Sequence, residues 1–147
     1  AKALALGADA VSIGQAALIA LGCNNRCHHD GEGWVDVTDD YRKLGAAPGF
    51  CHHCQTGRCP VGITTQDELL EQRLLPEKAA EWVRNYLQVV NMEVTTLARA
   101  CGKSDVHHLE REDLAALTVE AAAMARIPLA GTSWIPGRDT SGTDPAS

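Results

Sequence analysis

Closely spaced cysteines are the residues of this chain best suited to chemistry. Cys51, Cys54 and Cys59 fall within nine residues, and Cys23 and Cys27 lie upstream of them. Thiolates packed this closely form disulfides or bind metal. The sequence shows no export signal, and disulfides are rare in proteins that are not exported. Metal or redox chemistry is therefore the better interpretation of these cysteines.

Three kinds of site are compatible with this spacing. A structural zinc ion would use four thiolates, from Cys23, Cys27, Cys51 and Cys54. An iron–sulfur cluster would use Cys51, Cys54 and Cys59, with Cys23 as a further ligand. Pro60 follows the last of these cysteines, as is familiar in cluster sites. Free thiols are the least favoured interpretation, and spacing alone does not separate zinc from iron–sulfur.

A short α/β unit is expected before the cysteines. Ala1–Leu6 has the composition of a helix, Ala8–Ile13 that of a short strand, and Gln15–Gly22 that of a second helix. In the turn at Ser12–Ala16, Gly14 allows close approach of a ligand, and the first amides of the helix could bind an anion such as phosphate. Taken alone, this pattern favours a turn without a ligand.

The region around the cysteines contains few regular elements. Asn24–Gly49 has no sustained hydrophobic period, which predicts a long surface insertion with a helical turn at Asp39–Leu44. After the cysteines, Thr64 or Thr65 is expected to cap a helix over residues 66–74.

The strongest predicted element is a helix at Glu77–Cys101 that ends at Gly102. Its apolar residues recur three and four positions apart and form one stripe, which places Cys101 in a core rather than at a metal site. At about 1.5 Å per residue the helix would be close to 40 Å long.

Two shorter helices are expected further along the chain, at Glu110–Leu117 and Thr118–Ala125. His107 and His108 precede them and could suggest a metal site. Adjacent residues do not share a helix face, so this pair is expected at the surface or in a cap.

Composition limits the class of protein. The 147 residues carry a formal net charge of -6, which argues against nucleic-acid binding because there is no basic stripe. The longest apolar run, Ala16–Leu21, is too short to span a bilayer, so no membrane partner is expected. The chain starts at Ala1 rather than Met and ends in a tail rich in Gly, Pro, Ser, Thr and Asp. We therefore expect a C-terminal fragment of a larger cytoplasmic protein.

Several motifs together resemble the end of the FMN-binding domain of glutamate synthases, in particular the stand-alone FMN-domain proteins of that family. They are Gly7–Cys23, Cys54–Gln66 and Ala100–Leu109, and the resemblance covers most of residues 1–130. It implies the C-terminal end of a (β/α)8 TIM barrel, so that this chain is mostly α with one short strand and a long cysteine-bearing loop. The implied segments are 1–22 for the last helix–strand–helix unit of the barrel, 23–66 for the cluster loop, 67–130 for a helical extension and 131–147 for a flexible tail.

The resemblance also implies the site residues. The FMN phosphate site would contain Ser12, Gly14, Gln15 and Ala16, the glutamine standing where the family is expected to have threonine. The cysteines that bind a three-iron cluster (3Fe-4S) in the family match Cys23, Cys54 and Cys59. This chain departs from the family by its inserted loop and by extra thiols at Cys27 and Cys51. We rank Cys51 first as a fourth ligand, which would complete a four-iron cluster (4Fe-4S).

The function implied by the resemblance is reductive amination. In the family, ammonia condenses with 2-oxoglutarate to an imine, and reduced FMN converts the imine to glutamate while the cluster supplies electrons. Glutaminase-type and electron-donor subunits, or a ferredoxin, are the implied partners. No catalytic residue is expected in this chain, because substrate and most flavin contacts lie in earlier strands, and the fragment alone should be inactive. The alternatives are an N-methylglutamate-type synthase subunit and a zinc-stapled structural or interaction module.

Overall fold

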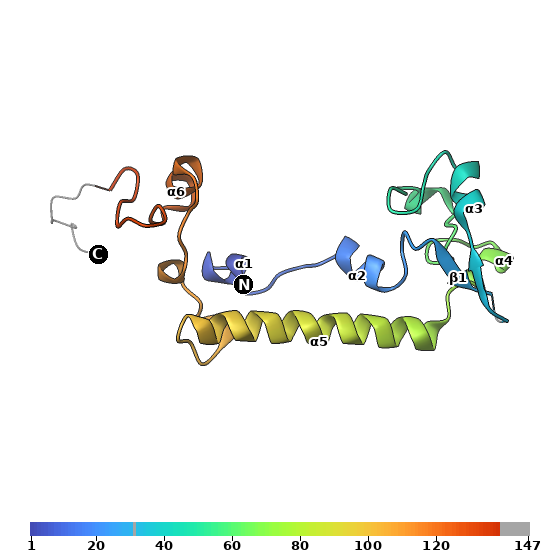
Figure 1. Cartoon of the computed structure of the whole chain (residues 1–147), viewed down its shortest axis with the longest axis horizontal. Helices are drawn as coiled ribbons and strands as arrows, with labels where there is room; N and C mark the ends of the chain where they lie inside the picture. The colour runs from blue at the N-terminus through green and yellow to red at the C-terminus, as the bar shows by residue number, and fades with distance from the viewer. Residues whose placement is uncertain (31, 139–147) are drawn as a thin grey trace. The chain divides into compact units, whose positions relative to one another are not determined.

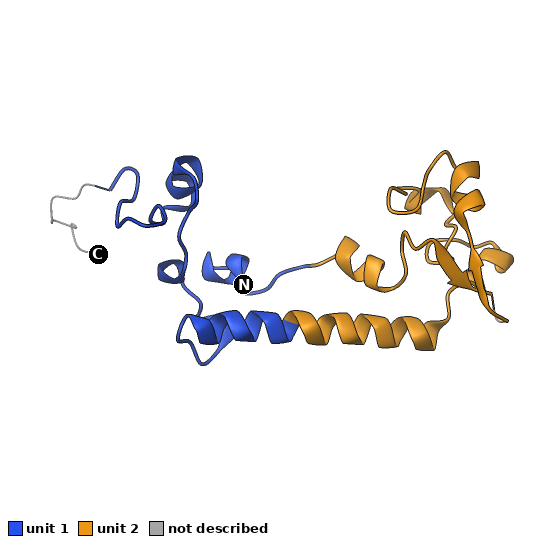
Figure 2. Cartoon of the chain, in the orientation of Figure 1, with its two compact units in different colours: residues 1–12, 91–147 blue, residues 13–90 orange. Residues whose placement is uncertain are grey.

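The structure is a computed structural model that describes residues 1–30 and 32–138 (Figure 1). The chain forms two compact units, one of residues 13–90 and the other of residues 1–12 and 91 onward (Figure 2). The elements are α1 Lys2–Ala5, α2 Gln15–Ala20, β1 Cys27–His29, β2 Trp34–Asp36, α3 Thr38–Lys43, η1 Cys54–Thr56, α4 Glu68–Glu71, α5 Pro76–Ala100, η2 Val106–His108, η3 Arg111–Asp113 and α6 Val119–Ala125.

The core of the unit of residues 13–90 is built around one tyrosine. Tyr41 is fully buried and packs with Val37, Cys59 and Val61. Its hydroxyl donates a hydrogen bond of 3.0 Å to the backbone oxygen of Asn25. Helix α3 carries this tyrosine, so the helical turn predicted at residues 39–44 is confirmed and anchors the segment in the core.

An antiparallel hairpin precedes α3, in a stretch that was expected to be irregular. Strands β1 and β2 pair in the register Cys27↔Asp36, His28↔Val35 and His29↔Trp34. The Asp30 carboxylate closes the turn by accepting hydrogen bonds from the amides of Glu32 at 2.9 Å and Gly33 at 2.8 Å. An aspartate followed by glycines is a hairpin signal that could have predicted this turn.

The hairpin packs on the start of the long helix. Trp34 of β2 stacks on Trp82 of α5, with ring centroids 6.4 Å apart. A Cβ added at Gly22 would lie 3.5 Å from His28 and 3.7 Å from Trp82, so the chain after α2 also approaches this packing closely. The 24–49 segment is therefore part of the folded unit rather than a peripheral loop.

The strand expected at Ala8–Ile13 is wrong. These residues lie in irregular backbone, and the described strands are those of the hairpin alone. A strand must pair its amides and carbonyls with a neighbour. None of residues 1–30 and 32–138 forms a strand pair or bridge with Ala8–Ile13.

Helix α5 at Pro76–Ala100 confirms the predicted long helix to within one residue at each end. Its stop is a Schellman motif, in which Gly102 has a φ of +76° and the Lys103 amide donates to Ala98. Cys101 was expected in the core and is instead exposed. The reason is that the helix has ended before it, so Ala98 takes the buried position.

The predicted cap of the helix after the cysteines differs from the structure. Helix α4 is capped by Asp67, which accepts hydrogen bonds from the amides of Leu69 and Leu70, and not by Thr64 or Thr65. An aspartate is at least as good a cap as a threonine, so the choice of residue could have been made from the sequence.

The segment expected to be a helix at Glu110–Leu117 contains only the three-residue η3. Helix α6 is confirmed, with the Thr118 hydroxyl as its cap. His107 and His108 are exposed in η2, as expected.

The unit that contains both ends of the described chain has two small cores. One is formed by Ala5, Ala98 and Leu109, and the other by Ala116, Ala122 and Ile127. The predicted flexible tail lies outside the described residues from position 139 onward.

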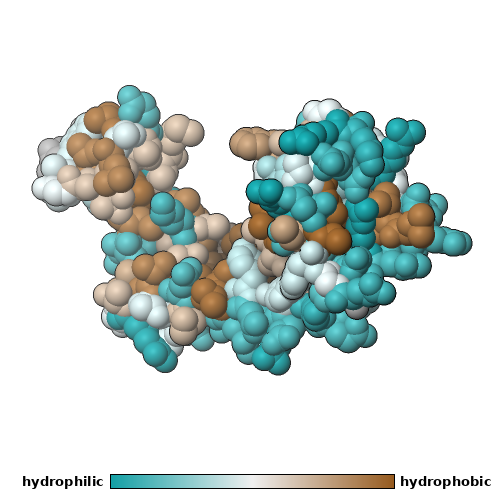
Figure 3. Space-filling view, turned by 45° about the vertical axis from the view of Figure 1, so that its right-hand side comes forward, coloured by the Kyte–Doolittle hydropathy of each residue, from teal (hydrophilic) through white to brown (hydrophobic). Residues whose placement is uncertain are grey.

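The apolar stripe of α5 is only partly covered by the described residues. Leu87 and Leu97 are 46% and 52% exposed. Figure 3 shows hydrophobic residues, in brown, that are open to solvent. None of the described helices is long and apolar enough to cross a membrane.

Gly62→Ala is expected to destabilise the unit of residues 13–90 by about 2–4 kcal/mol. Gly62 has a φ of +79°, and an added Cβ would collide with the backbone oxygen of Leu70. Gly45→Ala is the matched control, because Gly45 has a φ of +70° but open space around it. This control should cost only about 1–2 kcal/mol. Urea unfolding followed by circular dichroism measures both, and equal losses would contradict the collision with α4.

Candidate metal centre

The unit of residues 13–90 brings four of the predicted ligands together. Burial raises the pKa of the Cys23 thiol, and the nearby thiols of Cys54, Cys59 and Cys51 raise it further. Thiols that affect one another in this way are neighbours in the fold, although they lie far apart in the sequence. Cys27 is half-buried in β1.

Cys23 is positioned by the end of a helix. Helix α2 stops in a Schellman motif, in which Gly22 has a φ of +113° and the Cys23 amide donates to Leu18 over 2.8 Å. The glycine lets the chain turn sharply at this point, because other residues pay a steric cost at such a φ. The sequence predicted this stop, and the cysteine directly follows it.

Cys54 and Cys59 lie on the two sides of a tight loop. Cys54 is exposed at the start of η1, and Cys59 is buried in the turn that Gly62 closes, where the Gly62 amide donates to the Cys59 oxygen over 3.2 Å. Cys51 is half-buried and packs against the core around Tyr41. The site is thus buried at one end and open at the other.

Cys59 has the environment of a stabilised thiolate. Burial acts to raise the pKa of its thiol, but the nearby backbone amides of Thr64, Val61 and Ile63 outweigh it and lower the pKa overall. Amide donors favour the charged form of the acceptor. The Thr64 hydroxyl acts in the same direction, although Thr64 Oγ1 is buried and makes no hydrogen bond of standard geometry within the described residues.

Tyr41 covers the buried end of this site. Burial, followed by the thiols of Cys51, Cys23 and Cys59, raises the pKa of Tyr41, so its phenol stays neutral at physiological pH. A neutral, fully buried ring beside the sulfurs excludes water from them. The periodicity of the sequence did not reveal this role, because Tyr41 lies in a helix of only six residues.

A guanidinium group lies beside the same loop. Arg73 donates a hydrogen bond of 2.6 Å to the backbone oxygen of Pro60 and pairs with Asp40 at 2.8 Å. Both side chains of the ion pair are mostly buried, being 22% and 27% exposed. Arg73 therefore joins α3 to the residue that follows Cys59.

The donor set is one that an iron–sulfur cluster can use. Within the described residues, no three His, Cys, Asp or Glu side chains form a group that could hold a metal ion. A tetrahedral zinc site needs its thiolates about 2.3 Å from one centre. An iron–sulfur cluster binds each thiolate through a different iron, so its ligands are spread wider. The amide donors at Cys59 and the unpartnered Thr64 hydroxyl fit such a cluster.

The turn predicted to bind phosphate is open to solvent. Ser12, Gly14, Gln15 and Ala16 are all exposed, and a Cβ added at Gly14 would meet nothing within 4 Å. Gly14 is the cap of α2, whose first amides have no partner within the helix. Nothing in this geometry tests whether the turn binds a ligand.

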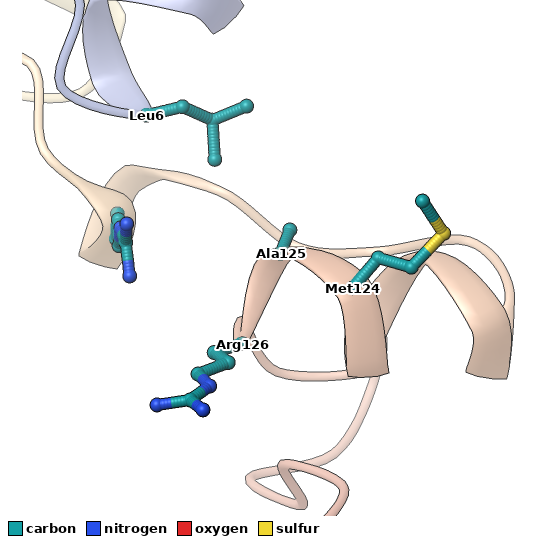
Figure 4. A pocket seen from close by; sticks show the side chains of 5 residues that line it. Leu6, Met124, Ala125 and Arg126 are labelled. Atoms are coloured by element: carbon teal, nitrogen blue, oxygen red, sulfur yellow. The ribbon is translucent and has the colours of Figure 1, made fainter.

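A separate hollow lies in the unit that contains α1 and α6. It has a volume of about 470 Å³ and is lined by Leu6, Arg111, Met124, Ala125 and Arg126 (Figure 4). None of the predicted site residues lines it. The predicted metal ligands all lie in the unit of residues 13–90.

This chain is similar to known proteins over most of its length. The family model described as a conserved region in glutamate synthase matches residues 1–41 and 46–104. The matched ranges include most of the 24–49 segment, where an insertion relative to the family was expected. No solved structure gives a significant match.

Individual relatives agree with the family match. A glutamate synthase large subunit-like protein of Rhizobium meliloti is 54% identical over 140 residues, which are 95% of this chain and 30% of that protein. An archaeal glutamate synthase (NADPH) of Methanocaldococcus jannaschii is 36% identical over 108 residues, 74% of this chain and 16% of that protein. The chain thus spans less than a third of the length of these relatives.

Tyr41→Phe is expected to lower the free energy of unfolding by about 1–3 kcal/mol. The substitution removes the hydroxyl and leaves the backbone oxygen of Asn25 without its partner. Tyr86→Phe in α5 is the matched control and should change the free energy by less than about 0.5 kcal/mol. Urea unfolding of the unliganded chain measures both, and equal effects would show that the Tyr41 hydroxyl does not stabilise the unit.

Proposed function

Because the chain belongs to the glutamate synthase family, we propose that its cysteines hold an iron–sulfur cluster that exchanges electrons with a flavin. The observation that carries the proposal is the meeting of Cys23, Cys51, Cys54 and Cys59 in one folded unit. Three of these positions match the cysteines that the family resemblance assigns to its cluster. The fourth, Cys51, belongs to the same neighbourhood.

The chain's own residues have distinct roles toward such a cluster. The four cysteines supply thiolates, and the amides of Val61, Ile63 and Thr64 stabilise the negative charge at Cys59. Tyr41 keeps water from the buried side. When bound, the cluster supplies or accepts single electrons, and hydrogen bonds and burial around the sulfurs set its potential.

FMN is the second proposed cofactor. We place its phosphate at the turn containing Ser12, Gly14, Gln15 and Ala16, on the strength of the family resemblance and of the exposed first amides of α2. This position agrees with the usual phosphate site at the end of a (β/α)8 barrel. The chain would contribute only this part of the flavin site.

The reaction proposed for the whole protein is reductive amination of 2-oxoglutarate with ammonia, giving glutamate. Its remaining parts lie outside this chain, which spans 30% of the Rhizobium meliloti relative. The proposed partners are a glutaminase-type subunit that delivers ammonia and an electron-donor subunit or ferredoxin. The setting is cytoplasmic, and we assign no catalytic acid or base to the residues of this chain.

A zinc-stapled module is the less favoured function. It would need Cys27 together with Cys23, Cys51 and Cys54. A zinc site would leave Cys59 unused, although nearby backbone amides outweigh burial and lower the pKa of its thiol. This observation favours the cluster.

Cys59→Ser is expected to reduce bound iron and sulfide severalfold and to remove most of the brown colour after anaerobic reconstitution, because it removes a ligand thiolate. Cys101→Ser is the matched control, since Cys101 is exposed and lies in the other unit. It should leave iron, sulfide and the visible spectrum unchanged. A colourless wild-type chain with one zinc, or an unaffected Cys59→Ser variant, would contradict the proposal.

A further inference from the structure

Asn24 directly follows Cys23 and has an unusual backbone conformation. Its φ is +63°, and Arg126 is the other non-glycine residue with a positive φ in the described part of the chain. Asparagine tolerates this left-handed conformation better than most residues, because its short side chain can form local hydrogen bonds. The conformation turns the Asn24 side chain away from the course of α2.

The carboxamide of Asn24 binds both backbone groups of one distant residue. Its Oδ1 accepts a hydrogen bond from the amide of Cys51 at 2.8 Å, and its Nδ2 donates to the oxygen of Cys51 at 3.4 Å. The backbone oxygen of Asn24 also accepts from the Gly49 amide at 3.2 Å. Two of these bonds join Asn24 to Cys51, 27 residues away in the sequence, and the third joins Asn24 to Gly49.

A third side-chain contact of Asn24 is with the sulfur of the preceding residue, Cys23. Asn24 Nδ2 lies 3.7 Å from Cys23 Sγ and donates to it. The same amide group thus bonds both Cys23 and Cys51, and an amide donor favours a charged sulfur over a neutral one.

We infer that Asn24 is a positioning residue that holds Cys51 beside Cys23, so that the site offers four thiolates and binds a four-iron cluster. This inference rests on the proposed cluster function and deepens it. Cys51 is half-buried and packs against the core around Tyr41, so its position in the folded unit is fixed. The Asn24 side chain adds direct bonds to the Cys51 backbone from the residue next to Cys23.

The test uses the whole chain, reconstituted under argon with ferrous iron and sulfide. Wild type is expected to bind about four irons per chain and to be silent in electron paramagnetic resonance (EPR) when oxidised. Cys51→Ser should bind about three irons and show the EPR signal of an oxidised three-iron cluster. Cys27→Ser is the matched control and should behave like wild type.

Two variants test Asn24 itself. Asn24→Gly allows the same φ but removes all side-chain contacts, so it should give the same three-iron signal as Cys51→Ser. Asn24→Asp keeps the acceptor for the Cys51 amide but loses both Nδ2 bonds, to the Cys51 oxygen and to Cys23 Sγ. Because one of the two lost bonds is to a charged sulfur, the variant should lose the fourth iron at least about tenfold faster during mild oxidation.

The outcomes separate this inference from the proposed function. A wild-type chain without iron and sulfide would end the proposed function. A wild-type three-iron cluster that Cys51→Ser leaves unchanged would overturn the inference and leave the proposed function standing. If Asn24→Gly retains the four-iron cluster, or if Asn24→Asp loses iron at the wild-type rate, Asn24 does not position Cys51. Circular dichroism of each unliganded variant shows whether it is folded. If Asn24→Gly is unfolded, the rate of iron loss from Asn24→Asp decides whether Asn24 positions Cys51.

Discussion

The burial of Tyr41 is the interaction on which the cysteine region depends. Its ring packs with Val37, Cys59 and Val61, and its hydroxyl bonds the backbone of Asn25. A buried aromatic side chain contributes several kcal/mol, so few single contacts could replace it in a unit this small. Because helix α3 carries Tyr41, the segment between the first and the later cysteines is folded against the loop that holds Cys59. Separated thiols meet because this core forms.

Placing several thiolates close together is unfavourable because their negative charges repel one another. Other groups in the unit of residues 13–90 reduce this repulsion. Burial, and after it the neighbouring sulfurs, raises the pKa of Cys23 and of Tyr41, so negative charge there is unfavourable in the unliganded chain. Amides at Cys59 act in the opposite direction, and the guanidinium of Arg73 places positive charge beside Pro60. The irons of the proposed cluster would supply the remaining compensation, which gives a physical reason for thiols to be collected so closely.

The sequence predicted features that depend on local pattern. Helix α5 and its stop followed from periodicity and a glycine, and the grouping of cysteines followed from their spacing. The prediction of a strand at Ala8–Ile13 was wrong because a strand needs a neighbouring strand, which the local sequence pattern does not reveal. The prediction that Cys101 is buried was wrong because the apolar stripe was extended one residue past the end of the helix. The roles of Asn24 and Thr64 could not be predicted, since both depend on contacts formed only in the folded unit.

Helix α2 works as a spacer of fixed length. It begins after Gly14, where we place the flavin phosphate, and its stop leads directly into Cys23. Six helical residues at about 1.5 Å each separate its ends by roughly 9 Å. One inserted residue would lengthen this spacer by about 1.5 Å and swing Cys23 around the axis by about 100°. The electronic coupling between the two proposed redox centres would then change through geometry alone, so the number of residues in α2 should matter more than their identity.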